Sequence, residues 1–576
     1  MPRPRLLKVE PTPMNADRLL ALFEQISEAP DAIPRLRRFI LDLAVRGKLV
    51  EQDPEDEPAE VLLESIAAEK LYLEKTGEIK RGKKVPDPDE PPFLLPESWR
   101  WTRLAGTGIL NPRNTAYDDL DAAFVPMPCI FAEYGIPNTH EVRSWGQIKK
   151  GYTHFMEGDV GLAKITPCFE NGKSTVFRGL TGGIGSGTTE LHVLRPLQVS
   201  PEYILIFLKS PYFISRGIPR MTGTAGQKRI PLEYFALSPF PLPPLAEQHR
   251  IVAKVDELMT LCDQLEAARQ QREQCRESLV AASLQRLNQP SYEPEAFRSD
   301  ARFALQVLPS FTSTPTQIMQ LRQTILNLAV RGKLVEQDPE DEPAEEQLER
   351  IIEAKILHGR KARATKKKQS DATAEADSFQ LPDGWATAPL ADLVTVLNGR
   401  AYKQSELLDV GTPVLRVGNL FTSNKWYYSD LELEDDKYCN DGDLIFAWSA
   451  SFGPFIWNGG RAIYHYHIWK LPLHSTDDLS RDYLYLYLLN KTDGIKASGH
   501  GISMVHMTKE KMERLEVPLP PLAEQHRIVA KVDELMALCD QLEQQLSKAA
   551  QSRRGLLEAV LREALEGEIT ERTPSP

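Results

Sequence analysis

Long apolar runs, paired cysteines and an excess of positive charge are all missing from this sequence of 576 residues. No apolar run approaches the roughly 18 residues of a membrane-spanning helix, so we expect no membrane segment. Met1 to Glu10 lack the apolar core of a secretory signal. None of the six cysteines forms a C-x-x-C pair or lies beside a histidine at zinc-ligand spacing. These absences indicate reduced thiols and a cytoplasmic location.

Catalytic signatures are missing as well. The segment Gly223–Lys228 is too short for a phosphate-binding loop, and Arg229 follows it instead of Ser or Thr. Glu90-Pro91-Pro92-Phe93 resembles the catalytic loop of amino-methyltransferases, but it stands in a proline-rich linker without a glycine-rich cofactor site. No H-E-x-x-H motif is present. We therefore expect no active site, no metal and no cofactor in this chain.

The net charge of −12 has the opposite sign to that expected for a protein that binds nucleic acid. Its distribution is uneven. Residues 100–240 carry 15 Lys and Arg against 11 Asp and Glu, a net charge of +4. Residues 386–517 carry 13 against 17, a net charge of −4. If both regions bind a polyanion, the second must place its charges on separate faces.

Two segments occur twice in the chain without a single change. LAVRGKLVEQDPEDEPAE fills Leu43–Glu60 and Leu328–Glu345, and PLPPLAEQHRIVAKVDEL fills Pro241–Leu258 and Pro518–Leu535. The regions that they enclose, about 100–240 and 386–517, show little likeness to each other. An identical framework around different inserts predicts two similar scaffolds that present two different surfaces.

The framework segments have helical periodicity. Long helices are expected over His249–Leu287 and His526–Leu565, after a proline-rich PLPPLAEQ stop. Their apolar residues form a heptad seam that calls for partner helices: Ile251, Val255, Leu258, Cys262 and Leu265, then Ile528, Val532, Leu535, Cys539, Leu542 and Leu546. Two near-identical seams favour antiparallel pairing with each other. Gly47 and Gly332 are expected to end shorter framework helices.

The inserts contain short apolar runs bounded by Gly, Pro and Asn, which predict strands over Asp159–Ile165, Glu190–Leu194, Pro413–Val417 and Leu444–Trp448. Helices are expected over Tyr203–Ser210 and Tyr483–Asn490. The fold class is therefore α+β: two mixed, strand-rich domains separated by long antiparallel coiled-coil helices, with a pseudo-two-fold internal repeat. Lys80–Lys84 and Arg360–Lys368 are basic linkers, either solvated or in contact with phosphates.

PLPPLAEQHRIVAKVDELM closing a strand-rich region and opening a long helix, twice in one chain, resembles the specificity subunits of Type I restriction-modification systems. LAVRGKLVEQDP before each insert resembles the larger IB-type members. The resemblance implies that each insert is a target recognition domain for half of a split DNA sequence. It implies double-stranded DNA, two methyltransferase subunits and two restriction subunits as partners. S-adenosylmethionine, ATP and Mg²⁺ would then act in those partners.

On this interpretation the chain divides into six regions. The framework comprises an N-terminal helical region with a basic linker (1–98), a central coiled-coil helix (241–290), a linker with the second copy of the helical region (291–380) and a C-terminal coiled-coil helix (518–576). The target recognition domains fill 99–240 and 381–517.

Loops with donors and acceptors for base edges and phosphates are the expected DNA contacts. In the first domain they are Asn171, Lys173, Ser186, Thr188, Thr189, Gln227, Lys228 and Arg229. In the second domain they are Asn398, Arg400, Tyr402, Lys403, Trp448, Ser449, Ser451, His500, Ser503, His506 and Lys509.

Two other functions are alternatives to a DNA-specificity subunit. One is a fused methyltransferase or nuclease with its own recognition domains, against which the missing cofactor motif counts. The other is a coiled-coil scaffold that binds only proteins.

Overall fold

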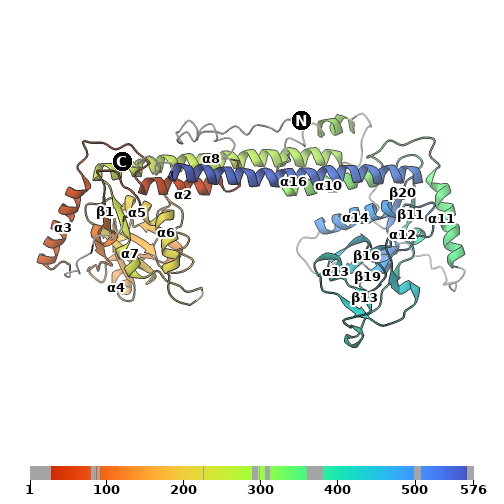
Figure 1. The fold of residues 1–576 in the computed structure, drawn as a ribbon, viewed down its shortest axis with the longest axis horizontal. Helices are drawn as coiled ribbons and strands as arrows, with labels where there is room; N and C mark the ends of the chain where they lie inside the picture. Colours follow the sequence, from red (N-terminus) through yellow and green to blue (C-terminus); the bar gives the residue numbers. More distant parts are fainter. Residues whose placement is uncertain are drawn as a thin grey trace, which may run out of the picture. The chain divides into compact units, whose positions relative to one another are not determined.

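The structure is a computed structural model. It describes residues 28–79, 86, 91–224, 226–288, 296–297, 299–304, 312–359, 381–449, 451–498 and 508–566 (Figure 1). The basic linkers Lys80–Lys84 and Arg360–Lys368 lie outside the described residues, as do His500, Ser503 and His506. The chain forms two compact units: the first unit comprises 1–271 with 550–576, and the second unit comprises 272–549.

The long helices begin earlier than expected. α8 spans Leu245–Leu287 and α16 spans Leu522–Glu566, so the Ala-Glu-Gln of each PLPPLAEQ segment is helical and not part of the stop. Proline is tolerated just before the first helical turn, where no intrahelical N–H bond is lost. Accordingly the carbonyl of Pro244 accepts the N–H of Gln248, and that of Pro521 accepts the N–H of Gln525.

The seam of α8 packs on α2 (Ala32–Val45) within the first unit. Ile251, Val255 and Cys262 are buried there, and Arg37 of α2 pairs with Asp263 at 2.5 Å and with Glu266 at 3.0 Å. The end of α16 completes this helix group, since Leu557 and Val560 pack on Ala29 and Ala32.

The second unit repeats this arrangement. Its framework helix α10 (Pro315–Val330) packs on the seam of α16, and Arg322 pairs with Asp540 at 2.7 Å. The end of α8 completes the group through Leu284 and Leu321. The seam was therefore predicted correctly as a packing surface, but its partner within each unit includes a framework helix that heptad spacing does not identify.

The shorter framework helices end as expected. Gly47 and Gly332 adopt φ values of +68° and +65°, the left-handed conformation that closes a helix. A second helix follows in each copy, α3 (Ala59–Thr76) and α11 (Ala344–Gly359).

The first strand-rich domain contains two four-stranded sheets, with strand orders β2-β9-β6-β7 and β4-β3-β8-β5. Strands β1 and β10 pair antiparallel where the insert meets the framework. β6 and β9 and helix α5 confirm three predicted elements. The strands are β1 (Arg100–Arg103), β2 (Gly108–Leu110), β3 (Asp121–Val125), β4 (Glu141–Ser144), β5 (Thr153–Met156), β6 (Val160–Ala163), β7 (Ser174–Val176), β8 (Ile184–Gly187), β9 (Leu191–Pro196) and β10 (Pro239–Leu242). The helices are α4 (Trp145–Ile148), α5 (Pro201–Lys209), α6 (Pro211–Gly217) and α7 (Leu232–Leu237).

The second strand-rich domain has sheets of order β12-β19-β16-β17 and β14-β13-β18-β15, with β11 and β20 at the framework boundary. β13, β16 and α14 confirm the predicted elements. The strands are β11 (Ala386–Pro389), β12 (Leu397–Asn398), β13 (Thr412–Leu415), β14 (Tyr427–Ser429), β15 (Tyr438–Cys439), β16 (Leu444–Ser449), β17 (Ser451–Ile456), β18 (Ala462–Tyr464), β19 (Ile468–Lys470) and β20 (Glu516–Leu519). The helices are α12 (Leu390–Leu393), α13 (Val417–Phe421), α14 (Arg481–Ser498) and α15 (Lys509–Glu513).

The two inserts share one topology despite their dissimilar sequences. Taken in chain order, β2 to β9 of the first domain and β12 to β19 of the second occupy the same places in sheets of the same order. Even the parallel pair recurs, as β3 with β8 and β13 with β18. The fold is thus α+β with two strand-rich domains, and equivalent loops can be compared between the domains.

Hydrogen bonds between the framework segments explain why both segments are duplicated together. Glu247 of the second segment accepts bonds from Trp99 Nε1 at 2.9 Å and from Gln52 Nε2 of the first segment at 2.7 Å. Arg250 makes two bonds to Asp56, at 3.0 and 2.6 Å. The same network recurs in the second unit between the residues Gln337, Asp341, Trp385, Glu524 and Arg527.

Candidate nucleic-acid interface

Three loops meet at one place in the first strand-rich domain. The loop between β6 and β7 contacts the segment before α7, because the Thr166 N–H donates to the Lys228 carbonyl at 2.9 Å. The turn between β8 and β9 joins them through Glu190, whose carboxylate accepts two bonds of 2.9 Å from the Arg229 guanidinium. The structure therefore brings the three predicted groups of contact residues together.

Exposure differs among these predicted residues. Asn171, Thr189, Gln227 and Lys228 are exposed, whereas Lys173, Thr188 and Arg229 are partly buried. Ser186 is fully buried in β8, and its hydroxyl donates to the Ile148 carbonyl at 2.8 Å, which argues against a role in DNA contact.

The two basic residues of the 222–229 loop differ in their surroundings. The hydrogen bond from Arg229 lowers the pKa of Glu190, so this ion pair holds the loop against the β8–β9 turn. Lys228 has no carboxylate within 4.0 Å among the described residues, so its charge is available to an external anion.

Lys209 is a buried residue beneath the candidate loops that sequence analysis missed. Its ammonium lies beneath the loops and donates to the carbonyls of Phe131 at 3.2 Å, Ala132 at 2.9 Å and Gly172 at 3.2 Å. Burial lowers its pKa to about 7. Lys209 ends an apolar helix, a position at which lysine is usually solvated, so the sequence carries no sign that it links two loops.

Three segments also meet in the second strand-rich domain. The Gly399–Lys403 segment lies beside the turn between β18 and β19. There the backbone N–H of Arg400 donates to the Tyr464 carbonyl at 3.1 Å. The hairpin of β16 and β17 reaches the same turn, since Trp448 Nε1 donates to the Tyr466 carbonyl at 2.9 Å.

Among the predicted residues of this domain, Asn398, Lys403 and Lys509 are exposed, while Arg400, Tyr402, Trp448 and Ser449 are partly buried. Ser451 is placed only by its backbone, in the strand that pairs with β16. Arg400 bonds to Glu406 at 2.7 Å and lies over the Tyr402 ring at 5.4 Å. Lys509 lies on α15, where it pairs with Glu513 at 3.5 Å. Among the residues that the structure describes, no contact joins it to the other predicted residues.

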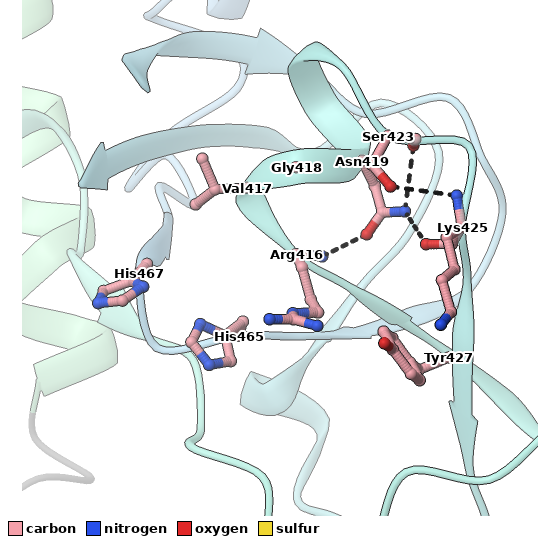
Figure 2. Close-up of a pocket in the computed structure, with 9 residues that line it drawn as sticks. All are labelled: Arg416, Val417, Gly418, Asn419, Ser423, Lys425, Tyr427, His465 and His467. Atoms are coloured by element: carbon pink, nitrogen blue, oxygen red, sulfur yellow. Dashed lines mark hydrogen bonds between the residues drawn. The ribbon is translucent and has the colours of Figure 1, made fainter. Parts of the chain in front are cut away.

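A pocket of about 310 Å³ opens beside the same turn, and the sequence analysis did not identify it. Figure 2 shows the Arg416 guanidinium between the rings of His465 and Tyr427, with Lys425 beyond the tyrosine. A His-Tyr-His run in a strand-to-strand turn was the available signal. The remaining lining residues are Val417, Gly418, Asn419, Ser423 and His467.

The shared topology places the two candidate interfaces on equivalent loops. The turn between β8 and β9, with Thr188 and Thr189, corresponds to the turn between β18 and β19, with His465 and His467. The loop between β6 and β7 likewise corresponds to the β16–β17 hairpin. Equivalent positions on one scaffold therefore carry different side chains.

The described part of the chain contains no group of three His, Cys, Asp or Glu side chains that could hold a metal ion. Within the same residues, none of the helices has the length and apolarity needed to cross a membrane. Thr222 and Arg229 form an antiparallel bridge, so the two ends of this glycine-rich segment are paired with each other.

The model of the Type I restriction modification DNA specificity domain matches residues 382–551. The EcoAI specificity subunit of Escherichia coli is 37% identical over 92% of this chain and 93% of its own length, and the EcoEI specificity subunit is 37% identical over 92% and 94%. The HsdS subunit of Thermoanaerobacter tengcongensis is 20% identical, with a TM-score of 0.46 over 83% of this chain and 100% of its own. On the strength of the two Escherichia coli relatives, this chain belongs to the Type I restriction-enzyme specificity subunits, the non-catalytic family that gives such enzymes their DNA sequence specificity.

Proposed function

We propose that each strand-rich domain of this specificity subunit reads one half of a split DNA target. The observation that carries the proposal is one strand order presented twice with different loop residues. Scaffolds of one strand order place equivalent loops at equivalent positions, so different loop side chains would read different base sequences. The recognition domains are then 99–240 and 381–517, with the framework regions 1–98, 241–290, 291–380 and 518–576 around them.

The long helices would set the distance between the half-sites. α8 runs from the first unit into the second, and α16 runs from the second unit into the first. This connectivity supports antiparallel pairing of the two helices. Readers on the same face of a duplex need half-site centres about one helical turn apart, roughly 34–36 Å.

Partner subunits would supply the chemistry. As a member of this family the chain acts with DNA and with restriction-modification subunits. We propose two methyltransferase subunits, docked on the framework helices, and two restriction subunits in the full complex. S-adenosylmethionine, ATP and Mg²⁺ would bind to those partners, and the complex would work in the cytoplasm.

The predicted residues that are exposed are the proposed contacts. They are Asn171, Thr189, Gln227 and Lys228 in the first domain and Asn398, Lys403 and Lys509 in the second. Lys173, Thr188, Arg229, Arg400, Tyr402, Trp448 and Ser449 would flank or support them. His500, Ser503, His506 and Ser451 stay predictions from the sequence.

Methylome sequencing tests the split target. A host that expresses this chain with its methyltransferase partner should carry one bipartite methylated motif with an unread spacer. A single continuous motif, or half-sites spaced half a helical turn away from the expected value, would overturn the proposal.

Lys228 and Arg229 provide a sharper test of the first domain. Lys228→Ala should weaken DNA binding by the complex and reduce the slope of log K against log salt by about 1, because one phosphate contact is lost. Arg229→Ala should disturb loop position and leave most of the slope, because its charge is already paired with Glu190. Gel-shift titrations at several salt concentrations measure both, and unchanged binding in both variants would remove this loop from the interface.

A further inference from the structure

The pocket in the second strand-rich domain is lined by hydrogen-bond donors. Arg416 and Lys425 can only donate hydrogen bonds, and a neutral His465 ring carries one donor N–H and one acceptor nitrogen. The side-chain amide of Asn419 is already engaged. Its oxygen accepts the backbone N–H of Arg416 at 3.1 Å, and its nitrogen donates to the backbone carbonyl of Lys425 at 2.9 Å. Donors of the pocket therefore outnumber its acceptors, which favours a partner that offers acceptors.

Arg416 and Lys425, the two cations of the pocket, have no carboxylate within 4.0 Å among the described residues. They lie against the ring of Tyr427, with Arg416 at 5.3 Å and Lys425 at 5.2 Å from its centre. This arrangement concentrates positive potential in a concave site, although residues 386–517 carry a net charge of −4. Burial, His467 and Arg416 lower the pKa of His465 to about 4, as expected in a positive environment.

The pocket is also built before any ligand arrives. Asn419 closes the turn from Arg416 to Lys425, and the Lys425 N–H donates to Ser423 Oγ at 3.1 Å. The opposite wall is the β18–β19 turn. It is held in place because the backbone N–H of His465 donates to the Leu415 carbonyl at 2.9 Å. Fixed walls lower the entropy cost of binding.

We propose that this pocket binds one backbone phosphodiester of the DNA target and so fixes the second recognition domain on the duplex. The inference rests on the proposed function and goes beyond it by assigning a site and a ligand chemistry. A phosphodiester offers only acceptors and carries one negative charge, which matches a site of donors with two unpaired cations. The major-groove edge of guanine also offers only acceptors, but it carries no charge, so two unpaired cations favour the phosphodiester over a base edge.

The test compares two double variants of the chain, each assembled with its methyltransferase partner. Arg416→Ala with Lys425→Ala removes the pocket cations. Arg461→Ala with Arg514→Ala removes two exposed cations of the same domain that already pair with Asp435 and Glu510. DNA affinity is measured by fluorescence anisotropy across a salt series, and the methylated motif is read by methylome sequencing.

The pocket variant should bind DNA about tenfold more weakly at low salt, with a slope of log K against log salt that is smaller by about 1. Its motif should stay unchanged, and the control variant should keep the slope of the original protein. An unchanged slope in the pocket variant, or a motif relaxed at one base, would overturn the phosphate assignment. If the double variant does not fold, Arg416→Gln, which keeps the side-chain bulk, decides on the same criteria.

The two proposals fail in different ways. If the unaltered complex does not bind a split motif, the proposed function is wrong. If it binds and the pocket variant behaves like the control, only the phosphate pocket is wrong.

Discussion

Cationic side chains in the two recognition domains fall into groups with different physical roles. Arg229 and Arg400 are held by Glu190 and Glu406, so they shape loops. Lys228, Arg416 and Lys425 have no carboxylate within 4.0 Å among the described residues, so their charge remains for a polyanion. Sequence analysis counted all basic loop residues alike, because an ion pair between distant residues is decided only by the fold.

Lys209 belongs to a third group, cations buried under a loop. Lys209→Met should destabilise the first unit by about 2–4 kcal/mol, because buried carbonyls lose their donor. It should also weaken DNA binding, since Gly172 lies in the loop between β6 and β7. Differential scanning calorimetry and anisotropy measure the two effects.

Lys70 provides the matched control for this prediction. Its ammonium donates to the carbonyls of Ala105 at 2.6 Å and Gly106 at 2.9 Å, away from the candidate loops. Lys70→Met should lower stability and leave DNA affinity unchanged. Equal losses of DNA affinity in both variants would mean that Lys209 acts only through stability.

His465 makes the second recognition domain sensitive to acid. Its pKa falls from an ordinary 6.5 to about 4 in the folded protein. Between these values the unfolded chain binds a proton that the folded chain does not, so stability decreases as pH falls through this window. His465→Gln should therefore reduce the loss of Tm between pH 7.5 and pH 5 in the second unit.

The first recognition domain supplies an internal reference for that measurement. Burial lowers the pKa of His154 and of His192 there, so its own acid sensitivity should be the same in the variant. A variant that keeps the full acid sensitivity of the second unit would contradict the assignment to His465.

At the scale of elements, the duplicated hydrogen-bond network of the framework should contribute equally to the stability of both copies. Trp99→Phe and Trp385→Phe each remove a donor to a buried glutamate, Glu247 or Glu524. We expect each to cost about 1–3 kcal/mol and to lower only the transition of its own unit. Calorimetry of the two variants checks this, and a cost confined to one copy would show that the networks are not equivalent.

Sequence patterns predicted the framework elements well, because long amphipathic helices and their glycine ends leave a strong periodic signal. The shared strand order of the inserts could not be predicted, since strands such as β12 and β15 have only two residues. The framework helix α2, which also covers the α8 seam, was not predicted for another reason: spacing identifies the buried face of a helix but not everything that covers it.

At the scale of the whole molecule, each unit contains the end of a long helix that begins in the other. Leu557→Asp should therefore speed hydrogen exchange in α2 of the first unit, and Leu284→Asp should do so in α10 of the second. A buried, unpaired carboxylate disrupts such packing strongly. Hydrogen exchange with mass spectrometry distinguishes the two patterns, and acceleration of the same helix by both substitutions would contradict this division.

Each long helix begins in one unit and ends in the other, and this has a consequence for shorter relatives of this chain. A gene encoding only one copy of the repeat would produce a protein whose long helix has an unpaired apolar end, and whose framework helix lacks a cover. In a symmetric homodimer of such a protein, the end of each long helix would pack on the framework helix of the other copy. The dimer would present the same recognition domain twice and would select an inverted repeat in place of two unlike half-sites.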